Sequence, residues 1–125
     1  MAKEKYLRLD PSGEVSWVTI DRDHLLEGLR DAIGCHWLEN VHLSCGFCAI
    51  VDEVGKIKDP PQPVNPLASR LYLGTLFGDP LVGPVVFARI DLVDGESDWC
   101  PLLPVQIRLL QNLLGVEIPD PEVAE

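Results

Sequence analysis

The amino-acid sequence predicts an α+β fold in which β-hairpins pack against a few helices. Two kinds of segment support this: some alternate apolar and polar residues with a period of two, and others place apolar residues at helical spacing. Turns rich in glycine and proline separate them. The order is hairpin, helix, hairpin, short helix, strand and C-terminal helix, which implies a mixed or antiparallel sheet. Hairpins wired around one crossing helix suggest a β-grasp-like arrangement.

The N-terminal segment predicts a β-hairpin. Residues 4–9 and 14–20 both alternate, and the second stretch is rich in the β-branched and aromatic residues that favour strands. Asp10-Pro11-Ser12-Gly13 between them is typical of a turn, because proline presets one backbone dihedral and glycine relaxes the next.

The following segment predicts the clearest helix of the chain. Asp21 or Asp23 can cap its first free N–H groups, and Gly34 can end it in the left-handed conformation. The apolar stripe between them consists of Leu25, Leu26, Leu29, Ala32 and Ile33.

The middle of the chain predicts a second hairpin. Residues 36–43 alternate, and residues 44–46 form a short turn. The continuous apolar run 47–51 indicates a strand that is buried on both faces. A polar turn over residues 52–56 follows.

Proline dominates the next stretch. Four prolines within residues 59–66 are incompatible with a strand ladder and indicate an extended loop. Pro66 suits the first position of a short helix over residues 67–73. Residues 82–92 then predict a strand, with Pro84 near its start.

The C-terminal end differs in charge from the rest. Residues 91–125 hold eight acidic residues and one basic residue. We predict an acidic loop that contains Asp91, Asp94, Glu96 and Asp98. Pro104 then begins a helix with Ile107, Leu110 and Leu114 on one stripe, and Gly115 ends it. Core packing is the first interpretation of this stripe, and a partner interface is the second.

Size and charge limit the classes of function. A chain of 125 residues is expected to form one domain, residues 1–125. A formal net charge of −10 argues against direct nucleic-acid binding and against attraction to an anionic membrane. The N-terminus resembles no signal peptide and no stretch is long and apolar enough to cross a bilayer, so we expect a cytoplasmic location with reduced thiols.

One cysteine motif raises the question of a metal. Cys45-Gly46-Phe47-Cys48 follows His42, and thiolates and imidazole are ligands that zinc prefers. The alternative interpretation is a small buried cysteine in a strand and another in a turn. Because no second pair of ligands accompanies this set, we predict no metal, with His42, Cys45 and Cys48 as the weaker alternative.

The sequence favours binding over catalysis. It holds neither a Gly-x-Ser-x-Gly elbow nor a glycine-rich phosphate loop. We therefore predict no enzyme activity and no cofactor.

A series of motifs resembles domain-of-unknown-function family 3846, a small α+β family found largely in bacteriophages and their bacterial hosts. The resemblance runs from about residue 15 to 91, and residues 92–125 add the acidic loop and the last helix. The motifs are Trp37-Leu38-Glu39, Asp52-Glu53-Val54-Gly55-Lys56, Asn65-Pro66-Leu67-Ala68-Ser69 and Gly83-Pro84-Val85-Val86-Phe87. The chain departs from the family pattern at Gly34-Cys35-His36-Trp37 and in its longer proline-rich loop.

The resemblance implies a phage-type accessory protein, and three hypotheses of binding follow. The first is an interaction module for an unidentified host or phage protein, and self-association remains open. The second is a site for an anionic, nucleotide-like molecule formed by Lys56, Lys58 and Asn65, where Asn65 could instead cap the following helix. The third is mimicry of DNA by Asp91, Asp94, Glu96 and Asp98 against a host DNA-binding protein.

Overall fold

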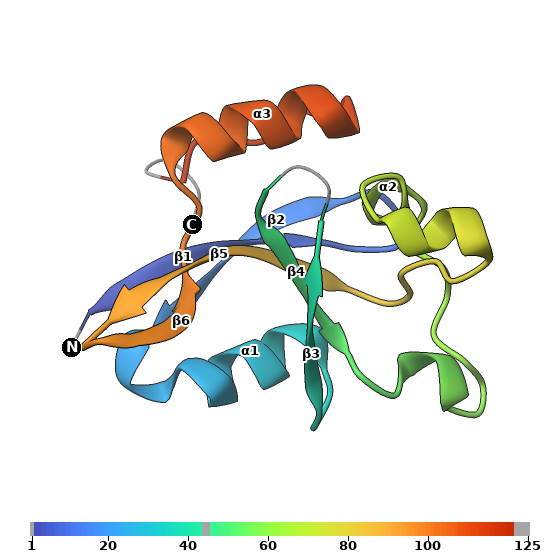
Figure 1. Cartoon of the computed structure of the whole chain (residues 1–125), viewed down its shortest axis with the longest axis horizontal. Coiled ribbons are helices and arrows are strands. Elements are labelled where there is room, and N and C mark those ends of the chain that lie inside the picture. The colour runs from blue at the N-terminus through green and yellow to red at the C-terminus, as the bar shows by residue number, and fades with distance from the viewer. Residues whose placement is uncertain (1, 44–45, 122–125) are drawn as a thin grey trace.

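A computed structural model describes residues 2–43 and 46–121 of the chain and has an α+β fold (Figure 1). An antiparallel sheet of six strands is combined with three α-helices in the described part. The elements are β1 (Lys3–Leu9), β2 (Val15–Asp21), α1 (Leu25–Ile33), β3 (Leu38–His42), β4 (Cys48–Asp52), α2 (Pro66–Ser69), β5 (Val85–Val93), β6 (Glu96–Cys100) and α3 (Pro104–Leu114). Short 3-10 turns add η1 (Arg22–His24), η2 (Gly55–Ile57) and η3 (Leu73–Phe77).

The strands follow the order β2-β1-β5-β4-β3, and β6 pairs with β5 outside this path. Every pairing is antiparallel. The first half of β5 lies between β1 and β4, whereas its second half, from Arg89, pairs with β6. The prediction of an α+β fold with an antiparallel sheet is thus confirmed, while the β-grasp resemblance is not.

Helices cover both faces of the sheet. Figure 1 shows α3 on one side and α1 on the other. Alternation along the strands sends neighbouring residues to opposite faces: Tyr6 joins the core under α1, and Leu7 joins the core under α3. Leu29 of α1 and Leu110 of α3 are fully buried at the centres of these two layers.

The strand β4, which lies between β5 and β3, is buried along its whole length, as its apolar run predicts. The predicted Gly34 end of α1 is confirmed, but the predicted aspartate cap at its start is not, because His24 precedes α1 without a side-chain cap. The Asp21 carboxylate accepts from the Asp23 N–H and begins η1, which leads directly into α1. Gly34 ends the helix at φ 78°, in the left-handed region.

The predicted acidic loop over Asp91, Asp94, Glu96 and Asp98 is wrong. Asp91 lies in β5, while Glu96 and Asp98 lie in β6, a strand that the sequence analysis missed. Asp94 and Gly95 both have positive φ, at 53° and 84°, and make a two-residue turn between the strands. Asp-Gly is a preferred sequence for such a turn, so the sequence does contain a hairpin signal. The acidic residues around it led instead to the prediction of a solvated loop.

Two boundaries also differ from the prediction. The last long strand begins at Val85 instead of residue 82, because Pro84 lacks the N–H that a ladder needs. The short helix ends at Ser69, and a separate 3-10 turn, η3, follows it. In the described residues, no helix is long and apolar enough to cross a membrane.

Candidate functional site

The family-like motifs meet at one end of the sheet, where Asn65 joins them. Its side chain is fully buried. Its Nδ2 donates to the carbonyl oxygens of Leu9 and Gly83, both at 3.0 Å. Its Oδ1 accepts from the Ala68 N–H at 3.3 Å and so caps α2. Both amide hydrogens are thus used within the fold, and the capping alternative for Asn65 is confirmed.

Ser69 continues these contacts toward η3, and we call Asn65 and Ser69 with their hydrogen bonds the platform. Its Oγ lies 2.7 Å from the Asn65 carbonyl and accepts the Leu81 N–H at 2.9 Å. The Thr75 hydroxyl donates to the Ser69 carbonyl at 2.6 Å, which ties η3 to α2. A Cβ on Gly74 would lie 2.5 Å from the Tyr72 ring, so glycine lets η3 turn closely over that ring. The platform therefore holds η3 in a defined position.

The two lysines of the proposed anion site are both ion-paired with carboxylates. Lys56 pairs with Asp79, and Lys58 pairs with Asp52. Asp52 is buried and also accepts the Val54 N–H at 3.0 Å. Each lysine charge is therefore offset locally, and the three residues predicted to hold an anion are engaged with other groups of the fold.

A small cavity lies between strands β3 and β4 and the two residues that flank η3, Tyr72 and Asp79. It is lined by Glu39, Val41, Val51, Asp52, Glu53, Lys56, Tyr72, Asp79, Leu81 and Val82. Its volume of about 60 Å³ is small, since sites for small molecules commonly measure about 300–1,000 Å³. A water molecule occupies roughly 30 Å³ in the liquid, so this space suits water instead of a nucleotide.

The turn η3, which the platform holds in place, exposes large apolar side chains. Leu73, Leu76 and Phe77 are 64%, 79% and 81% exposed, and we call them the η3 surface. Gly78 ends the turn at φ 78°, and its N–H bonds to the Gly74 and Thr75 carbonyls. The turn is thus closed by its own backbone while its apolar side chains face solvent.

The acidic residues of the β5–β6 hairpin have a different environment. Asp91 and Asp98 stand directly opposite each other in the register. Like charges in that position repel, and arginines offset both: Arg89 pairs with Asp91, and Arg22 pairs with Asp98. The Leu92 N–H and then Arg89 lower the pKa of Asp91 by hydrogen bonding. Asp94 lies in the turn and Glu96 begins β6, so the four predicted residues share one hairpin.

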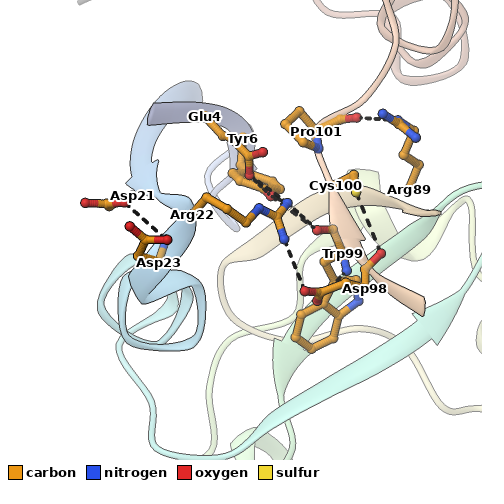
Figure 2. A network of polar contacts seen from close by, with 10 residues as sticks. All are labelled: Glu4, Tyr6, Asp21, Arg22, Asp23, Arg89, Asp98, Trp99, Cys100 and Pro101. Carbon is orange, nitrogen blue, oxygen red and sulfur yellow. Dashed lines mark hydrogen bonds and ion pairs between the residues drawn. The ribbon is translucent and has the colours of Figure 1, made fainter. Parts of the chain in front are cut away.

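Arg22 is the centre of a polar network that the sequence analysis did not find (Figure 2). Its Nη2 lies 2.7 Å from Glu4 Oε1, 3.1 Å from the Tyr6 hydroxyl and 2.7 Å from the Trp99 carbonyl. The network ties η1 to β1 and β6. Its signal was weak, because Arg22 resembles any polar residue at a helix start.

The network changes the titration of its members. Burial, followed by the hydrogen bond to Glu4, raises the pKa of Tyr6 well above its ordinary value. Burial alone lowers the pKa of Arg22, but the hydrogen bond to Glu4 raises it, and the net shift is upward. Tyr6 thus stays neutral and Arg22 stays charged, as a structural network requires.

The weaker metal set is only partly described. His42 and Cys48 pair across β3 and β4, whereas Cys45 lies outside the described residues. Cys48 is buried, its thiol lies 3.3 Å from the Ala88 carbonyl, and burial raises its pKa to about 11. Within residues 2–43 and 46–121, no three His, Cys, Asp or Glu side chains are grouped as metal ligands would be.

Comparison with known proteins identifies one family. A family model described as "Domain of unknown function (DUF3846)" matches residues 4–115 of the chain. This range includes every described helix and, apart from Lys3, every described strand residue. No curated protein and no solved structure matches the chain.

Proposed function

We propose that the chain, which belongs to the DUF3846 family, is a non-catalytic binding module that docks a protein partner through the η3 surface. The observation that carries this proposal is the exposure of Leu73, Leu76 and Phe77 on one short turn. The Asn65 and Ser69 platform supports it, because a docking turn needs a fixed position before binding.

The energy available from this turn is substantial. Burying one fully exposed Leu or Phe side chain contributes roughly 1.5–3 kcal/mol, so these three, which are already partly covered, contribute roughly 3–7 kcal/mol together. Association costs about 4–15 kcal/mol in lost motional freedom. The η3 surface therefore needs further contacts around it to form a stable complex.

Carboxylates beside η3 can supply these contacts. Asp79 follows η3 and Tyr72 precedes it, and both line the small cavity together with Glu39 and Glu53. In the described part of the chain, Glu39 and Glu53 have no ion pair, and both are exposed. Opposite charge at the rim of an interface guides association. We infer that the partner presents an apolar groove bordered by lysine or arginine.

A phage setting fits this function. The partner is then a host or phage protein made in the same cell, and the net charge of −10 favours a basic one. No membrane, cofactor or catalytic group enters the proposed mechanism.

The test is affinity capture with matched baits. Wild-type protein, a Leu76→Ser/Phe77→Ser variant and a Leu92→Ser variant are each immobilised and exposed to a lysate of the host. Leu92 is the control because it is 69% exposed but lies on the β5–β6 hairpin. A partner that docks on η3 is retained by wild type and by Leu92→Ser and is lost from the double variant.

Two further outcomes would reject the proposal. One is a partner retained equally by all three baits. The other is a partner lost from both variants, which would indicate a general loss of apolar contact. Repeating the capture at high salt tests the acidic rim, because retention of a basic partner should weaken as charges are screened.

A further inference from the structure

Among the described strands, β2 lies at one end of the sheet order and pairs only with β1. Such an edge presents unpaired backbone groups to its surroundings. Proteins commonly block such edges with proline, lysine or a bulge. β2 has none of these: its sequence is Val-Ser-Trp-Val-Thr-Ile-Asp, and its register with β1 is continuous over seven pairs.

Two backbone hydrogen bonds show which backbone groups of β2 point outward. The Arg22 N–H donates to the Ala2 carbonyl, and the Asp10 N–H donates to the Glu14 carbonyl, both at 2.9 Å. Both contacts continue the β1–β2 register, so its hydrogen-bonded pairs involve the even-numbered residues of β2. The N–H and C=O groups of Val15, Trp17, Thr19 and Asp21 therefore face away from β1. Within the described residues, no other backbone group bonds to them.

This outward pattern is self-complementary. When two copies of β2 align antiparallel with full overlap, the two-fold axis passes between their Val18 residues. Trp17 then faces Thr19 of the second copy, and Val15 faces Asp21. All four are outward-facing residues, so each N–H meets a C=O.

Charge favours the same register. Asp21 faces an uncharged Val15, so no carboxylates of the paired segments stand opposite each other. Just beyond the ends, Glu14 of one copy lies across from Arg22 of the other, whose guanidinium stays paired with Glu4 and Asp98 of its own chain, so no like charges meet there. We propose that two copies of this chain associate through β2 into one continuous antiparallel sheet across a two-fold axis. The dimer carries two η3 surfaces, so a partner with two grooves binds more tightly through avidity.

The first test is a symmetric cross-link. Val18→Cys places two thiols opposite each other at a position where the strands come closest, and mild oxidation should give a covalent dimer. Ser16→Cys is the matched control, because Ser16 faces Ile20 of the second copy and its thiols stay far apart. Both are made in a Cys35→Ser/Cys45→Ser background to remove competing thiols.

The second test removes an outward donor. Thr19→Pro deletes an N–H that β1 does not use, so the monomer should keep its fold. The dimer loses two hydrogen bonds by symmetry, and its dissociation constant should rise by roughly tenfold or more. Sedimentation equilibrium measures the mass of wild type and variant against the monomer mass of 13.8 kDa.

Three results would overturn the proposal. The first is that the wild-type protein is a monomer at a concentration of about 100 μM. The second is equal cross-linking of Val18→Cys and Ser16→Cys. The third is a dimer that Thr19→Pro leaves intact. A dimer disrupted by Leu109→Glu instead of Thr19→Pro would assign the contact to the exposed side of α3 and also reject pairing through β2.

Discussion

The Arg22 network and the η3 surface differ in the kind of side chain that they leave exposed to solvent. Around Arg22, charged and hydroxyl groups are partly buried, and each is ion-paired or hydrogen-bonded to the Arg22 guanidinium (Figure 2). At η3, backbone groups are matched underneath while Leu76 and Phe77 face solvent. The first arrangement stabilises the monomer. The second gives the monomer little and leaves apolar surface available to a partner.

This difference predicts that mutations at the two regions separate stability from binding. Changes at the Arg22 network and at the platform should lower the free energy of unfolding. Changes at the η3 surface should leave it nearly unchanged and reduce binding.

Arg22→Ala should cost about 3 kcal/mol of unfolding free energy, because it leaves the partly buried Glu4 carboxylate and the buried Tyr6 hydroxyl without their cation. Urea unfolding measures this loss. Lys3→Ala is the control, since Lys3 is 63% exposed in its 3.8 Å pair with Asp21 and such surface pairs contribute about 0–1 kcal/mol. Similar losses in the two variants would show that the network has no special role.

Asn65→Ala should cost about 3 kcal/mol, because two buried carbonyls lose their donors and α2 loses its cap. The same urea experiment measures it. Asn112→Ala on the exposed side of α3 serves as the control and should change stability by less than about 0.5 kcal/mol. A mild effect at Asn65 would mean that the platform is held by other contacts.

Alkaline pH should weaken the fold through Cys48. Its thiol pKa is raised from 9.0 to about 11, so the unfolded state loses its proton first. Stability is then constant below pH 9 and falls by about 2 kcal/mol as pH rises to 11. Tyr6, whose pKa is also raised, adds to the loss above pH 10.

Unfolding measured from pH 8 to 11 checks this, with Cys48→Ala as the comparison. The variant should lose less stability over that range, although it is less stable at pH 8. Parallel curves for the two proteins would contradict the assignment to Cys48.

The sequence predicted most of the fold because local patterns and tertiary packing agree there. The strands, the Gly34 end of α1 and the buried β4 all carry period or turn signals that the packing preserves. The missed strand β6 shows the limit: the Asp94-Gly95 turn signal was present, but the surrounding carboxylates suggested a solvated loop. Two arginines offset this charge, and one of them comes from the other end of the chain.

The candidate site was less predictable. The Asn65 cap follows from local chemistry and was one of two stated alternatives. The pairing of Lys56 with Asp79 depends on residues 23 positions apart, which no local pattern shows. The exposure of Leu76 and Phe77 was equally hidden, since an apolar residue near a proline-rich loop resembles a core residue until the fold shows what covers it.

The central claim is best tested by measuring binding and unfolding on one preparation of the Leu76→Ser/Phe77→Ser variant. Calorimetry with the captured partner should show at least a roughly tenfold weaker affinity, corresponding to about 1.4 kcal/mol. Urea unfolding of the same sample should remain within about 0.5 kcal/mol of wild type. Unchanged affinity, or a loss of stability large enough to explain weaker binding, would contradict the assignment of η3 as the docking surface.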